Sequence, residues 1–528
     1  MSNHAYESAA ALRPSSNGPI PISTLCERFS LAPASAEDAA ALSDLSILGV
    51  SVDSADTAPG ELFVGLPGFT VHGARFAADA VASGAVAVLT DADGAQIVRQ
   101  TAPGTPTLVH SDPRAVVGPL SAEVYHHPAR GLVTTAVTGT NGKTTTAYFL
   151  DAILSAHVGG CMVAGTVELR VGERSVESPR TTVEAPVLQR MMALAVEDKV
   201  GAASLEASSH AIVLHRLDGI VVDVAGFTNL QRDHLDFHKT MEGYLEAKAQ
   251  LFTPEHARRG VVCVDDQWGA ALAAEAPIEI DRVRAYPGET PADWWVSDAA
   301  VSLTDSATTF TLHGPDGEKI EASCPLPGLV NVQNAALALV MAIRAGVPAA
   351  TAAAALAGAH NIPGRMQRIS QRNGRRGLCI VDFAHTPEAM ELALKAVRPI
   401  TPGRLIVVFG SDGDRDQGKR PMLGEVCARL ADVLVVTDEN PRSEDPQLIR
   451  NAILEGVRGV RPDLTDVEEI TTWRGDAVRR GVELCGPDDT VIVTGKGHEP
   501  FLEMAGEFIR YNDAPVMAEA VEEKWGRV

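Results

Sequence analysis

The stretch 132–146, LVTTAVTGTNGKTTT, limits what this chain can fold into more than any other. Residues 132–137 are apolar and β-branched and predict a buried strand, and residues 147–154 continue as an apolar-rich helix. Between them a glycine turn leads into Lys143 and Thr144. This order is typical of a phosphate-binding loop, because glycines let backbone N–H groups approach phosphate oxygens and the helix N-terminus adds partial positive charge.

In such a loop Lys143 can bridge the terminal phosphates of a nucleotide, and the hydroxyl of Thr144 can reach Mg²⁺. The spacing differs from the general G-x-x-x-x-G-K-[ST] motif, whose first glycine would fall on Val137. A glycine turn with an ordinary surface lysine is the alternative, and the flanking strand and helix favour the phosphate site. The predicted loop comprises Gly139, Thr140, Asn141, Gly142, Lys143, Thr144 and Thr145.

A chain of 528 residues is too long for one core, and about 150 residues per domain suggests three or four domains. The sequence contains no apolar run of the roughly 18–20 residues that a membrane helix needs, and its start does not resemble a secretory signal. We expect residues 1–20 to form a disordered leader and no membrane to be a partner.

Seven cysteines are scattered without a CxxC pair, which indicates reduced thiols and a cytoplasmic location. The net charge of −23 argues against a nucleic acid or an anionic membrane as partner. It does not argue against nucleotides, which loops, lysines and metal ions bind locally.

Residues 21–130 predict a small α/β domain with strands at 62–64, 85–89 and 107–109 and a helix at 75–82. The segment 126–130, HHPAR, is interpreted as a linker, because its histidine pair has no further metal ligands nearby.

Residues 131–362 form the predicted central domain, whose strands end in polar islands at 180–182, 205–210 and 228–238. Glu206 follows a small apolar strand, where a Mg²⁺ ligand belongs downstream of a phosphate loop; alone it would be a surface residue. The third island suggests phosphate, metal or substrate contacts, or else a polar loop. Lys248 lies in a helical stretch, and spacing alone would make it a solvated lysine.

An alanine-rich helical stretch runs from about residue 328 to 359 and is broken at 346–348. Asn331 and Asn334 near its start are capping residues or nucleotide contacts. The breaker cluster HNIPG at 360–364 places a domain boundary there.

Residues 363–528 alternate strand and helix, with strands at 378–381, 405–409, 433–436 and 490–493. This pattern predicts a doubly wound parallel sheet. Polar loops follow all four strands, at the edge where such sheets bind ligands. The fold class is therefore α/β, with a second binding site at this edge.

With these motifs, the chain resembles the Mur ligases of peptidoglycan synthesis. The match rests on TGTNGKTT, EASSH, NLQRDHLDFH, YLEAKAQLF, GLVNVQNAALA, PGRMQ, DFAHTP, GSDGDRDQGKRPM, ENPRSEDP and GKGHE, which occur in the family's order from about residue 50 to 510. TGTNGKTT marks the wider ligase superfamily, whereas ENPRSEDP and GKGHE together resemble the members that add the third residue of the peptide.

The resemblance implies three domains: a UDP-sugar-binding α/β domain at 21–130, a P-loop ATPase-like sheet at 131–362 and a Rossmann-like amino-acid-binding sheet at 363–528. It implies that ATP phosphorylates the terminal carboxylate of UDP-MurNAc-L-Ala-D-Glu and that the amine of a diamino acid attacks the acyl phosphate. Positioning and charge neutralisation would dominate this chemistry. ATP and Mg²⁺ would be the cofactors of a cytoplasmic enzyme that we expect to be monomeric.

The resemblance also implies residue roles. Lys143, Glu206, His234 and Lys248 would be catalytic, with Thr144 and Glu206 on one Mg²⁺ and His234 and Lys248 on a second. Lys248 would be carbamylated by CO₂, because an ammonium cannot ligate a cation whereas a carbamate offers anionic oxygen. Further ATP contacts would be Asn229, Asn331, Asn334, Arg365 and Asp382, and UDP-sugar contacts would be Ser54, Thr181, Thr182, Ser208 and Arg216.

A D-N-P-R motif reads the distal end of meso-diaminopimelate in family members that add it. The residues implied here are Arg415, Glu439, Asn440, Pro441, Arg442, Gly495 and Glu499. Arg442 favours diaminopimelate over L-lysine, because its fork suits a second carboxylate. Glu439 departs from the expected Asp, and Ala55, Val183 and Leu214 depart near the UDP-sugar contacts.

Several alternatives stay open on the sequence. The same ligase could add L-lysine or another diamino acid. The chain could be another ligase of the superfamily, such as a folylpolyglutamate synthase or a different Mur step. From other classes, it could be a nucleotide-operated ATPase or binding protein, or an inactive scaffold.

Overall fold

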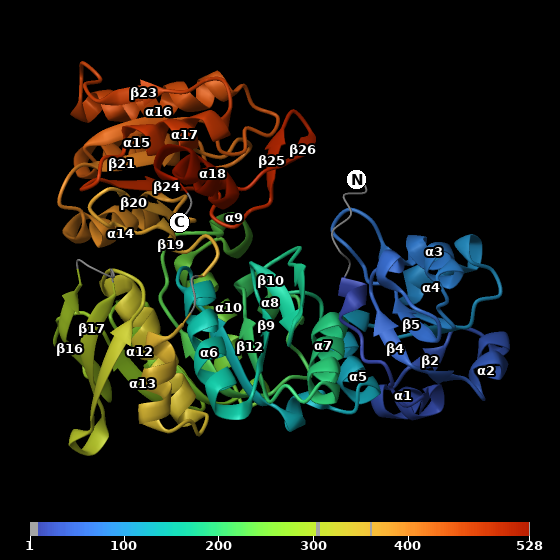
Figure 1. Cartoon of the computed structure of the whole chain (residues 1–528). Helices are drawn as coiled ribbons and strands as arrows, with labels where there is room; N and C mark the ends of the chain where they lie inside the picture. The colour runs from blue at the N-terminus through green and yellow to red at the C-terminus, as the bar shows by residue number, and fades with distance from the viewer. Residues whose placement is uncertain (1–8, 303–306, 360–361, 527–528) are drawn as a thin grey trace. The chain divides into compact units, whose positions relative to one another are not determined.

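A computed structural model describes residues 9–302, 307–359 and 362–526 (Figure 1). The chain forms two compact units, one of Met1–Trp295 with Ala336–Ala355 and one of Val296–Ala335 with Leu356–Val528. Both are built from parallel strands and helices, which confirms the α/β class. Within the described ranges, no helix is both long and apolar enough to cross a membrane.

The first unit begins with a five-stranded sheet in the order β2-β7-β6-β5-β4, in which only β2 is antiparallel to its neighbour. Along β5, Leu62 and Val64 pack into one core and Phe63 into another, because alternate side chains of a strand point to opposite faces. The elements are α1 (Ile22–Phe29), β2 (Ala32–Pro33), α2 (Ala36–Leu42), β4 (Gly49–Ser51), β5 (Glu61–Val64), α3 (Ala77–Ala82), β6 (Ala87–Thr90), α4 (Ala92–Thr101), β7 (Thr107–Val109) and α5 (Pro113–Val124).

Residues 9–18, here called the N-terminal strap, join this sheet to the central one. Leu12 is fully buried in the core of the central sheet, and the guanidinium of Arg190 donates to the carbonyl of Ala9 at 2.8 Å. Arg13 forms ion pairs with Asp56 and Glu61 of the N-terminal sheet. The expectation of a disordered leader is therefore wrong for residues 9–20, and residues 1–8 lie outside the described residues.

The first eight strands of the central sheet have the order β11-β10-β9-β12-β8-β13-β14-β15 and belong to the first unit. The strands from β9 to β15 are parallel, and β10 and β11 form an antiparallel extension. The strands are β8 (Val133–Thr138), β9 (Cys161–Ala164), β10 (Glu168–Val171), β11 (Arg174–Glu177), β12 (Ala202–Glu206), β13 (Val222–Phe227), β14 (Ala257–Cys263) and β15 (Glu279–Arg284).

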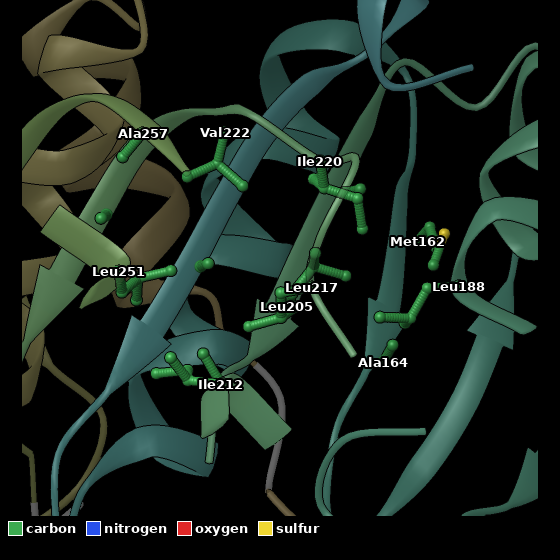
Figure 2. Packing of buried hydrophobic residues seen from close by; sticks show 14 of the residues in the cluster. Met162, Ala164, Leu188, Leu205, Ile212, Leu217, Ile220, Val222, Leu251 and Ala257 are labelled. Carbon is green, nitrogen blue, oxygen red and sulfur yellow. The ribbon is translucent and has the colours of Figure 1, made fainter. Parts of the chain in front are cut away.

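The apolar core holds β12 and β8 in a fixed register. Figure 2 shows Met162, Ala164 and Leu188 lying together, with Leu205 of β12 in the same cluster. The parallel pairing sets Glu206 opposite Val137, so the carboxyl ends of the two strands are neighbours. The residues that follow β8 and β12 therefore meet at one edge of the sheet.

Two helical predictions for the central region agree with the structure. The helix after the phosphate loop begins at Lys143, and the alanine-rich stretch is split into α12 and α13 as expected. Part of the breaker cluster, His360 and Asn361, lies outside the described residues. The helices are α6 (Lys143–Val158), α7 (Ala185–Glu197), α8 (Ser209–Val213), α9 (Leu235–His238), α10 (Met241–Ala249), α11 (Gln267–Glu275), α12 (Leu329–Arg344) and α13 (Ala349–Ala357).

The second unit contains a six-stranded sheet in the order β19-β20-β24-β21-β22-β23, in which β19 alone is antiparallel to its neighbour. The four predicted strands are confirmed as β20 (Leu378–Val381), β21 (Leu405–Phe409), β22 (Val433–Val436) and β24 (Thr490–Val493). The other elements are β17 (Thr308–His313), β18 (Lys319–Cys324), β19 (Gln367–Ser370), α14 (Pro387–Val397), α15 (Lys419–Leu430), α16 (Pro446–Val460), β23 (Val467–Glu469), α17 (Arg474–Leu484), β25 (Phe501–Met504), β26 (Glu507–Arg510) and α18 (Asp513–Trp525).

The N-terminal strap should contribute to stability. We expect Leu12→Ala to lower the free energy of unfolding by about 2–4 kcal/mol, because it leaves a cavity in the central core. Leu48→Ala, at a half-exposed leucine of the same unit, should cost less than about 1 kcal/mol. Urea titration measures the free energy of unfolding of both variants. If both lower it by the same small amount, the strap does not contribute to stability.

Candidate functional site

The phosphate loop between β8 and α6 has a backbone that only glycine adopts readily. Gly139 has a φ of 146° and Gly142 one of 89°. A Cβ at Gly139 would lie 1.9 Å from the hydroxyl of Thr228, so the neighbouring strand end also excludes a side chain. The ammonium of Lys143 donates to the carbonyls of Gly139 and Thr140 at 3.0 and 2.8 Å.

Asn229, at the end of β13, holds this loop from the side. Its Oδ1 accepts from the backbone N–H of Asn141 at 3.1 Å, and its Nδ2 donates to the carbonyl of Asn141 at 3.2 Å. Gln231 adds a contact that the sequence analysis missed, since its Oε1 accepts from Asn141 Nδ2 at 2.7 Å. Both residues belong to the predicted third polar island, which the structure therefore places against the phosphate loop.

Glu206 is the last residue of β12 and is 1% exposed. Its Oε2 accepts from the hydroxyls of Thr144 at 3.0 Å and Thr166 at 2.9 Å, and its Oε1 accepts from the Thr166 N–H at 2.8 Å. Thr166 was missed, because nothing in its sequence context distinguishes it from a turn residue.

A carboxylate and a hydroxyl that meet at a phosphate loop are oxygen ligands suited to Mg²⁺. In the described part of the chain, no group of three or more His, Cys, Asp and Glu side chains could hold a metal alone. Glu206 and Thr144 therefore fit a Mg²⁺ ion only if phosphate oxygens and water complete its shell.

Lys248, on α10, is buried at 1% exposure rather than solvated as its spacing alone suggested. Its ammonium donates to the Gly139 carbonyl at 2.7 Å and lies 4.5 Å from the ring centroid of Tyr244. Burial, together with repulsion from Lys143, lowers the pKa of Lys248 well below its usual value. As an ammonium it cannot ligate a cation, so it fits a metal site only after modification.

His234 lies half-exposed in a left-handed conformation, with its ring centroid 4.9 Å from that of His210 and 6.2 Å from that of Tyr244. Burial lowers its pKa, and the positive charges of Lys143 and Lys248 act in the same direction against Asp233. A lowered pKa favours the neutral imidazole, which is the metal-binding form.

Four of the five predicted UDP-sugar residues gather beside Glu206. The Thr182 hydroxyl donates to the Glu206 carbonyl at 2.7 Å and accepts from the Ser208 N–H at 3.0 Å. Arg216 donates to the Thr182 carbonyl at 3.1 Å, and the Thr181 hydroxyl lies 3.2 Å from that of Thr166.

The fifth predicted residue, Ser54, lies in the short 3-10 turn Ser54–Asp56 beside the N-terminal sheet. Within the described ranges no hydrogen bond joins it to the other four. Its turn is held by an ion pair of 3.0 Å between Asp56 and Arg190.

Arg180, from the predicted polar island at 180–182, and Arg114, which the sequence analysis missed, add positive charge here. Glu184 receives the guanidinium groups of Arg216 at 2.9 Å, Arg180 at 3.1 Å and Arg114 at 3.7 Å. Burial lowers the pKa of Arg216, and Arg180 and Arg114 oppose its charge while Glu184 favours it. One carboxylate against three guanidinium groups leaves net positive charge, which suits an anionic substrate.

The second unit carries the remaining predicted nucleotide residues. Asn331 donates to the Pro327 carbonyl at 2.8 Å, and Oδ1 of the buried Asn334 finds no hydrogen-bond partner among the described residues. Asp382 follows β20 and accepts from the N–H groups of Met366 at 2.7 Å and Ala384 at 2.9 Å. Arg365 stacks 4.3 Å from the Phe383 ring centroid.

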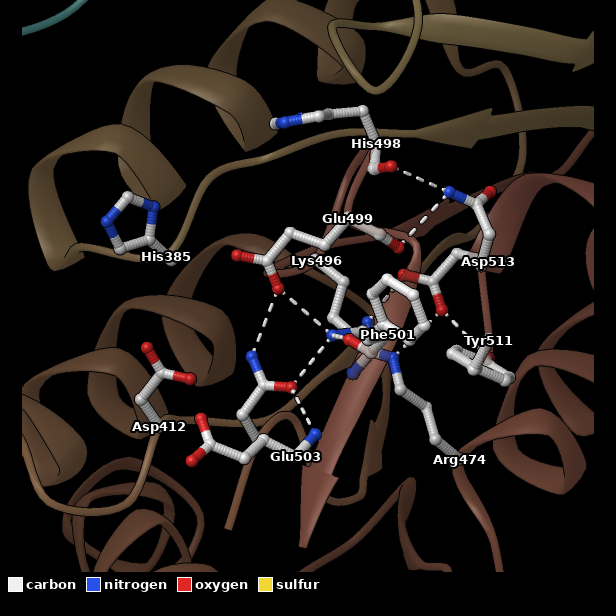
Figure 3. Close-up of polar contacts among 12 residues, drawn as sticks. His385, Asp412, Arg474, Lys496, His498, Glu499, Phe501, Glu503, Tyr511 and Asp513 are labelled. Atoms are coloured by element: carbon white, nitrogen blue, oxygen red, sulfur yellow. Dashed lines mark hydrogen bonds and ion pairs between the residues drawn. The ribbon is translucent and has the colours of Figure 1, made fainter. Parts of the chain in front are cut away.

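The loops after β22 and β24 join several of the predicted amino-acid contacts, and Figure 3 shows Glu499 of this set beside Lys496. Asn440 donates to Glu499 at 3.0 Å, and Lys496, which was missed, donates to both residues. A Cβ on Gly495 would lie 2.4 Å from Glu439 Oε2, so only glycine fits against that carboxylate. Pro441 is buried against Gly413, whereas Arg415 is exposed.

Arg442 has a left-handed φ of 55°, and its N–H donates to the carbonyl of Glu503 at 3.0 Å. Its guanidinium lies 3.6 Å from the carboxylate of Glu503 and 3.8 Å from that of Asp412. Burial raises the pKa of Glu439 to about 8, and the charges of Asp412 and Glu499 add to this effect. Carboxylates and a guanidinium thus face one place, as a ligand with both an amine and a carboxylate requires.

Sequence profiles of known families match the chain in three places. The profile of the Mur ligase middle domain matches residues 137–342, that of the Mur ligase glutamate ligase domain matches 364–497, and that of the Mur ligase family catalytic domain matches 46–124.

Two curated proteins illustrate the similarity. The chain is 43% identical over 480 residues to the UDP-N-acetylmuramoyl-L-alanyl-D-glutamate--2,6-diaminopimelate ligase of Streptomyces coelicolor, covering 91% of this chain and 93% of that protein. It is 42% identical over 508 residues to the UDP-N-acetylmuramyl-tripeptide synthetase of Leifsonia xyli, covering 95% and 96%.

Solved structures agree with these matches. A UDP-N-acetylmuramoyl-L-alanyl-D-glutamate--2,6-diaminopimelate ligase aligns with a TM-score of 0.63 at 31% identity, over 90% of this chain and 95% of that chain. The MurF ligase of Thermotoga maritima in complex with ADP aligns with a TM-score of 0.61 over 90% and 97%, and at 18% identity it shows a shared fold.

The raised pKa of Glu439 predicts a pH dependence of stability. The unfolded chain ionises this group near pH 4.5 and the folded protein near pH 8, so the folded state binds more protons between these values and stability falls as pH rises. Glu439→Gln should flatten this fall by an amount on the order of a few kcal/mol. Urea titrations of the whole protein at pH 5 and pH 8, for wild type and Glu439→Gln, measure this difference. If the free energy of unfolding falls equally with pH in both proteins, the raised pKa of Glu439 is contradicted.

Proposed function

Because the chain belongs to the Mur ligase family, we propose that it is the ATP-dependent ligase that joins meso-2,6-diaminopimelate to UDP-N-acetylmuramoyl-L-alanyl-D-glutamate in peptidoglycan synthesis. ADP and phosphate are the other products. The proposal is supported by the names of the similar proteins, which cover more than nine-tenths of the chain. All seven cysteines are free, which fits the cytoplasmic location we predict, and a monomeric state also stays a prediction.

One observation carries the proposal: Glu206 joins the phosphate loop to the acceptor residues. Its carboxylate accepts from Thr144 of the loop, and its carbonyl accepts from Thr182. A terminal phosphate bound at Thr144 and a carboxylate bound at Thr182 and Ser208 would therefore be close. This is the arrangement that phosphoryl transfer to a carboxylate requires, since positioning supplies much of the rate.

In the first step the carboxylate of the D-glutamyl residue attacks the terminal phosphorus of ATP, the bond to the bridging oxygen breaks, and ADP leaves. The loop N–H groups and Lys143 bind the phosphates and stabilise the charge that develops on them. Arg216, with Arg114 and Arg180 beside it, binds the anionic substrate and reduces its repulsion from ATP. The amine of the diamino acid then attacks the acyl phosphate, and inorganic phosphate leaves.

Mg²⁺ would be held by Thr144 and Glu206, where it would neutralise phosphate charge. Lys248 and His234 would hold a second ion only if Lys248 carries a carbamate. The lowered pKa of Lys248 supports this modification, because the neutral amine is the form that reacts with CO₂.

In the amino-acid site, the distal carboxylate of diaminopimelate would bind Arg442, and its distal ammonium would bind the carboxylate of Glu499, with Glu439 beside it. L-Lysine has no second carboxylate, so it would form no ion pair with Arg442 and would bind more weakly than diaminopimelate.

Carbamylation of Lys248 can be tested without relying on turnover. With ¹³C-labelled bicarbonate, the wild type should show a carbamate signal by ¹³C NMR that disappears in Lys248→Ala and persists in Lys199→Ala, an exposed lysine of the same unit. Lys248→Ala should also lose about a hundredfold or more in kcat, because an anionic ligand is removed where charge develops. A fully active Lys248→Ala would contradict the role.

The function itself is tested by phosphate release with ATP, Mg²⁺ and UDP-MurNAc-L-Ala-D-Glu, varying only the amino acid. Meso-diaminopimelate should be preferred over L-lysine, L-ornithine and L-diaminobutyrate by about a hundredfold or more, because the site would leave charged groups unpaired with the others. A preference for a one-carboxylate diamine would keep the ligase and change its substrate. Release without any amine would favour an ATPase instead.

A further inference from the structure

Lys496, in the loop after β24, is fully buried. Its ammonium donates to Asn440 Oδ1 at 2.8 Å, to Glu499 Oε2 at 3.0 Å and to the carbonyl of Phe501 at 2.6 Å (Figure 3). An ammonium has three N–H donors, so these three acceptors use them all. Lys496 therefore has no donor left with which to bind a ligand. Its hydrogen bonds instead hold the surrounding groups in place.

The groups it fixes include two predicted contacts of the amino acid. Asn440 Nδ2 donates to the same Glu499 Oε2 at 3.0 Å, so one carboxylate oxygen is held by two donors. Glu499 Oε1 makes no hydrogen bond to any described residue, and Figure 3 shows it pointing away from Lys496. With 36% of its side chain exposed, Glu499 can reach a ligand through that oxygen.

The third hydrogen bond of Lys496, to the carbonyl of Phe501, connects it to the residues around Arg442. Phe501 is the first residue of β25, and Glu503 lies on the same strand. Glu503 accepts through its carbonyl from the Arg442 N–H, and its own N–H donates to Asn440 Oδ1 at 3.1 Å. The Lys496 ammonium thus connects Glu499, which would bind an amine, to strand β25. Strand β25 in turn bonds to Arg442, which would bind a carboxylate.

We propose that Lys496 is a positioning residue that sets amino-acid specificity: it locks Asn440 and Glu499 so that the unpaired Oε1 of Glu499 meets the distal ammonium of a diamino dicarboxylic acid. The inference rests on the proposed function, whose substrate it explains in more detail. Lys496 does not touch the substrate. Its effect reaches the amino acid through Glu499 and Asn440, and neither ATP nor the UDP-sugar peptide depends on it.

The test is steady-state kinetics of Lys496→Met, which keeps the aliphatic stem and removes the donors. The KM for meso-diaminopimelate should rise about tenfold or more, the size expected for losing a charge-assisted hydrogen bond that orients a ligand. The preference for diaminopimelate over L-lysine should fall by a similar factor, while the KM values for ATP and UDP-MurNAc-L-Ala-D-Glu stay within about twofold. An unchanged KM and preference would overturn the proposal.

A double-mutant cycle separates positioning from a merely structural role. Glu499→Gln alone should raise the KM for diaminopimelate, and adding Lys496→Met to it should raise the KM little further, because the lysine acts through that carboxylate. If the two effects multiply, Lys496 acts independently of Glu499 and the proposal is wrong.

Lys524 of α18, an exposed lysine of the same unit, provides a control for the loss of ammonium hydrogen bonds. Its ammonium also makes three hydrogen bonds, to the carbonyls of Val482 at 2.9 Å, Glu483 at 2.8 Å and Cys485 at 2.6 Å, and none reaches a predicted site residue. Lys524→Met should lower Tm and leave the KM for diaminopimelate unchanged. An equal rise in KM would show that the effect of Lys496→Met is one of stability.

Should Lys496→Met unfold, Lys496→Arg keeps the charge and tests the same point. A planar fork cannot place three donors where an ammonium places them, so a raised KM and a weakened preference are again expected. A folded arginine variant with wild-type kinetics would overturn the proposal. A wild type that fails to ligate diaminopimelate would instead overturn the proposed function.

Discussion

The buried carboxylate of Glu206 is the constraint on which the first unit depends. A carboxylate out of water is stable only when hydrogen bonds replace its hydration, and here those bonds come from Thr144 and Thr166 on two separate loops. Satisfying this one group therefore fixes the phosphate loop, the end of β9 and the end of β12 relative to one another. The register that sets Glu206 opposite Val137 is what makes this possible.

The second unit also contains a buried charge at a sheet edge, but there it is a cation, the ammonium of Lys496. Lys496 lies buried at the carboxyl end of a parallel strand, and its partners come from the loops that follow β22 and β24. Removing a charged group from water costs several kcal/mol, so such a residue persists only with all of its bonds made. In both units a buried charge gives rigidity at the sheet edge where ligands of parallel sheets bind.

Much of this fold could be predicted from the sequence, because four of the six strands of the C-terminal sheet are apolar runs buried on both faces and end in polar loops. The phosphate loop could be predicted from local order alone. Lys248 could not be placed by its spacing, because burial is a tertiary property of α10. Thr166, Arg114 and Lys496 were missed for the same reason: each acquires its role from residues distant in sequence that only the folded sheet brings near.

The N-terminal strap has a consequence for how the chain is made. Arg190 binds the carbonyl of Ala9 across 181 positions of sequence, and the Ser15 N–H donates to Glu197 across 182. These two contacts therefore cannot form until α7 has been synthesised, whereas the ion pairs of Arg13 with Asp56 and Glu61 need only the N-terminal sheet. Contacts of such long sequence separation form late in folding. We therefore expect the N-terminal sheet to form before residues 9–15 dock against α7, so this docking is a late step in the folding of the first unit.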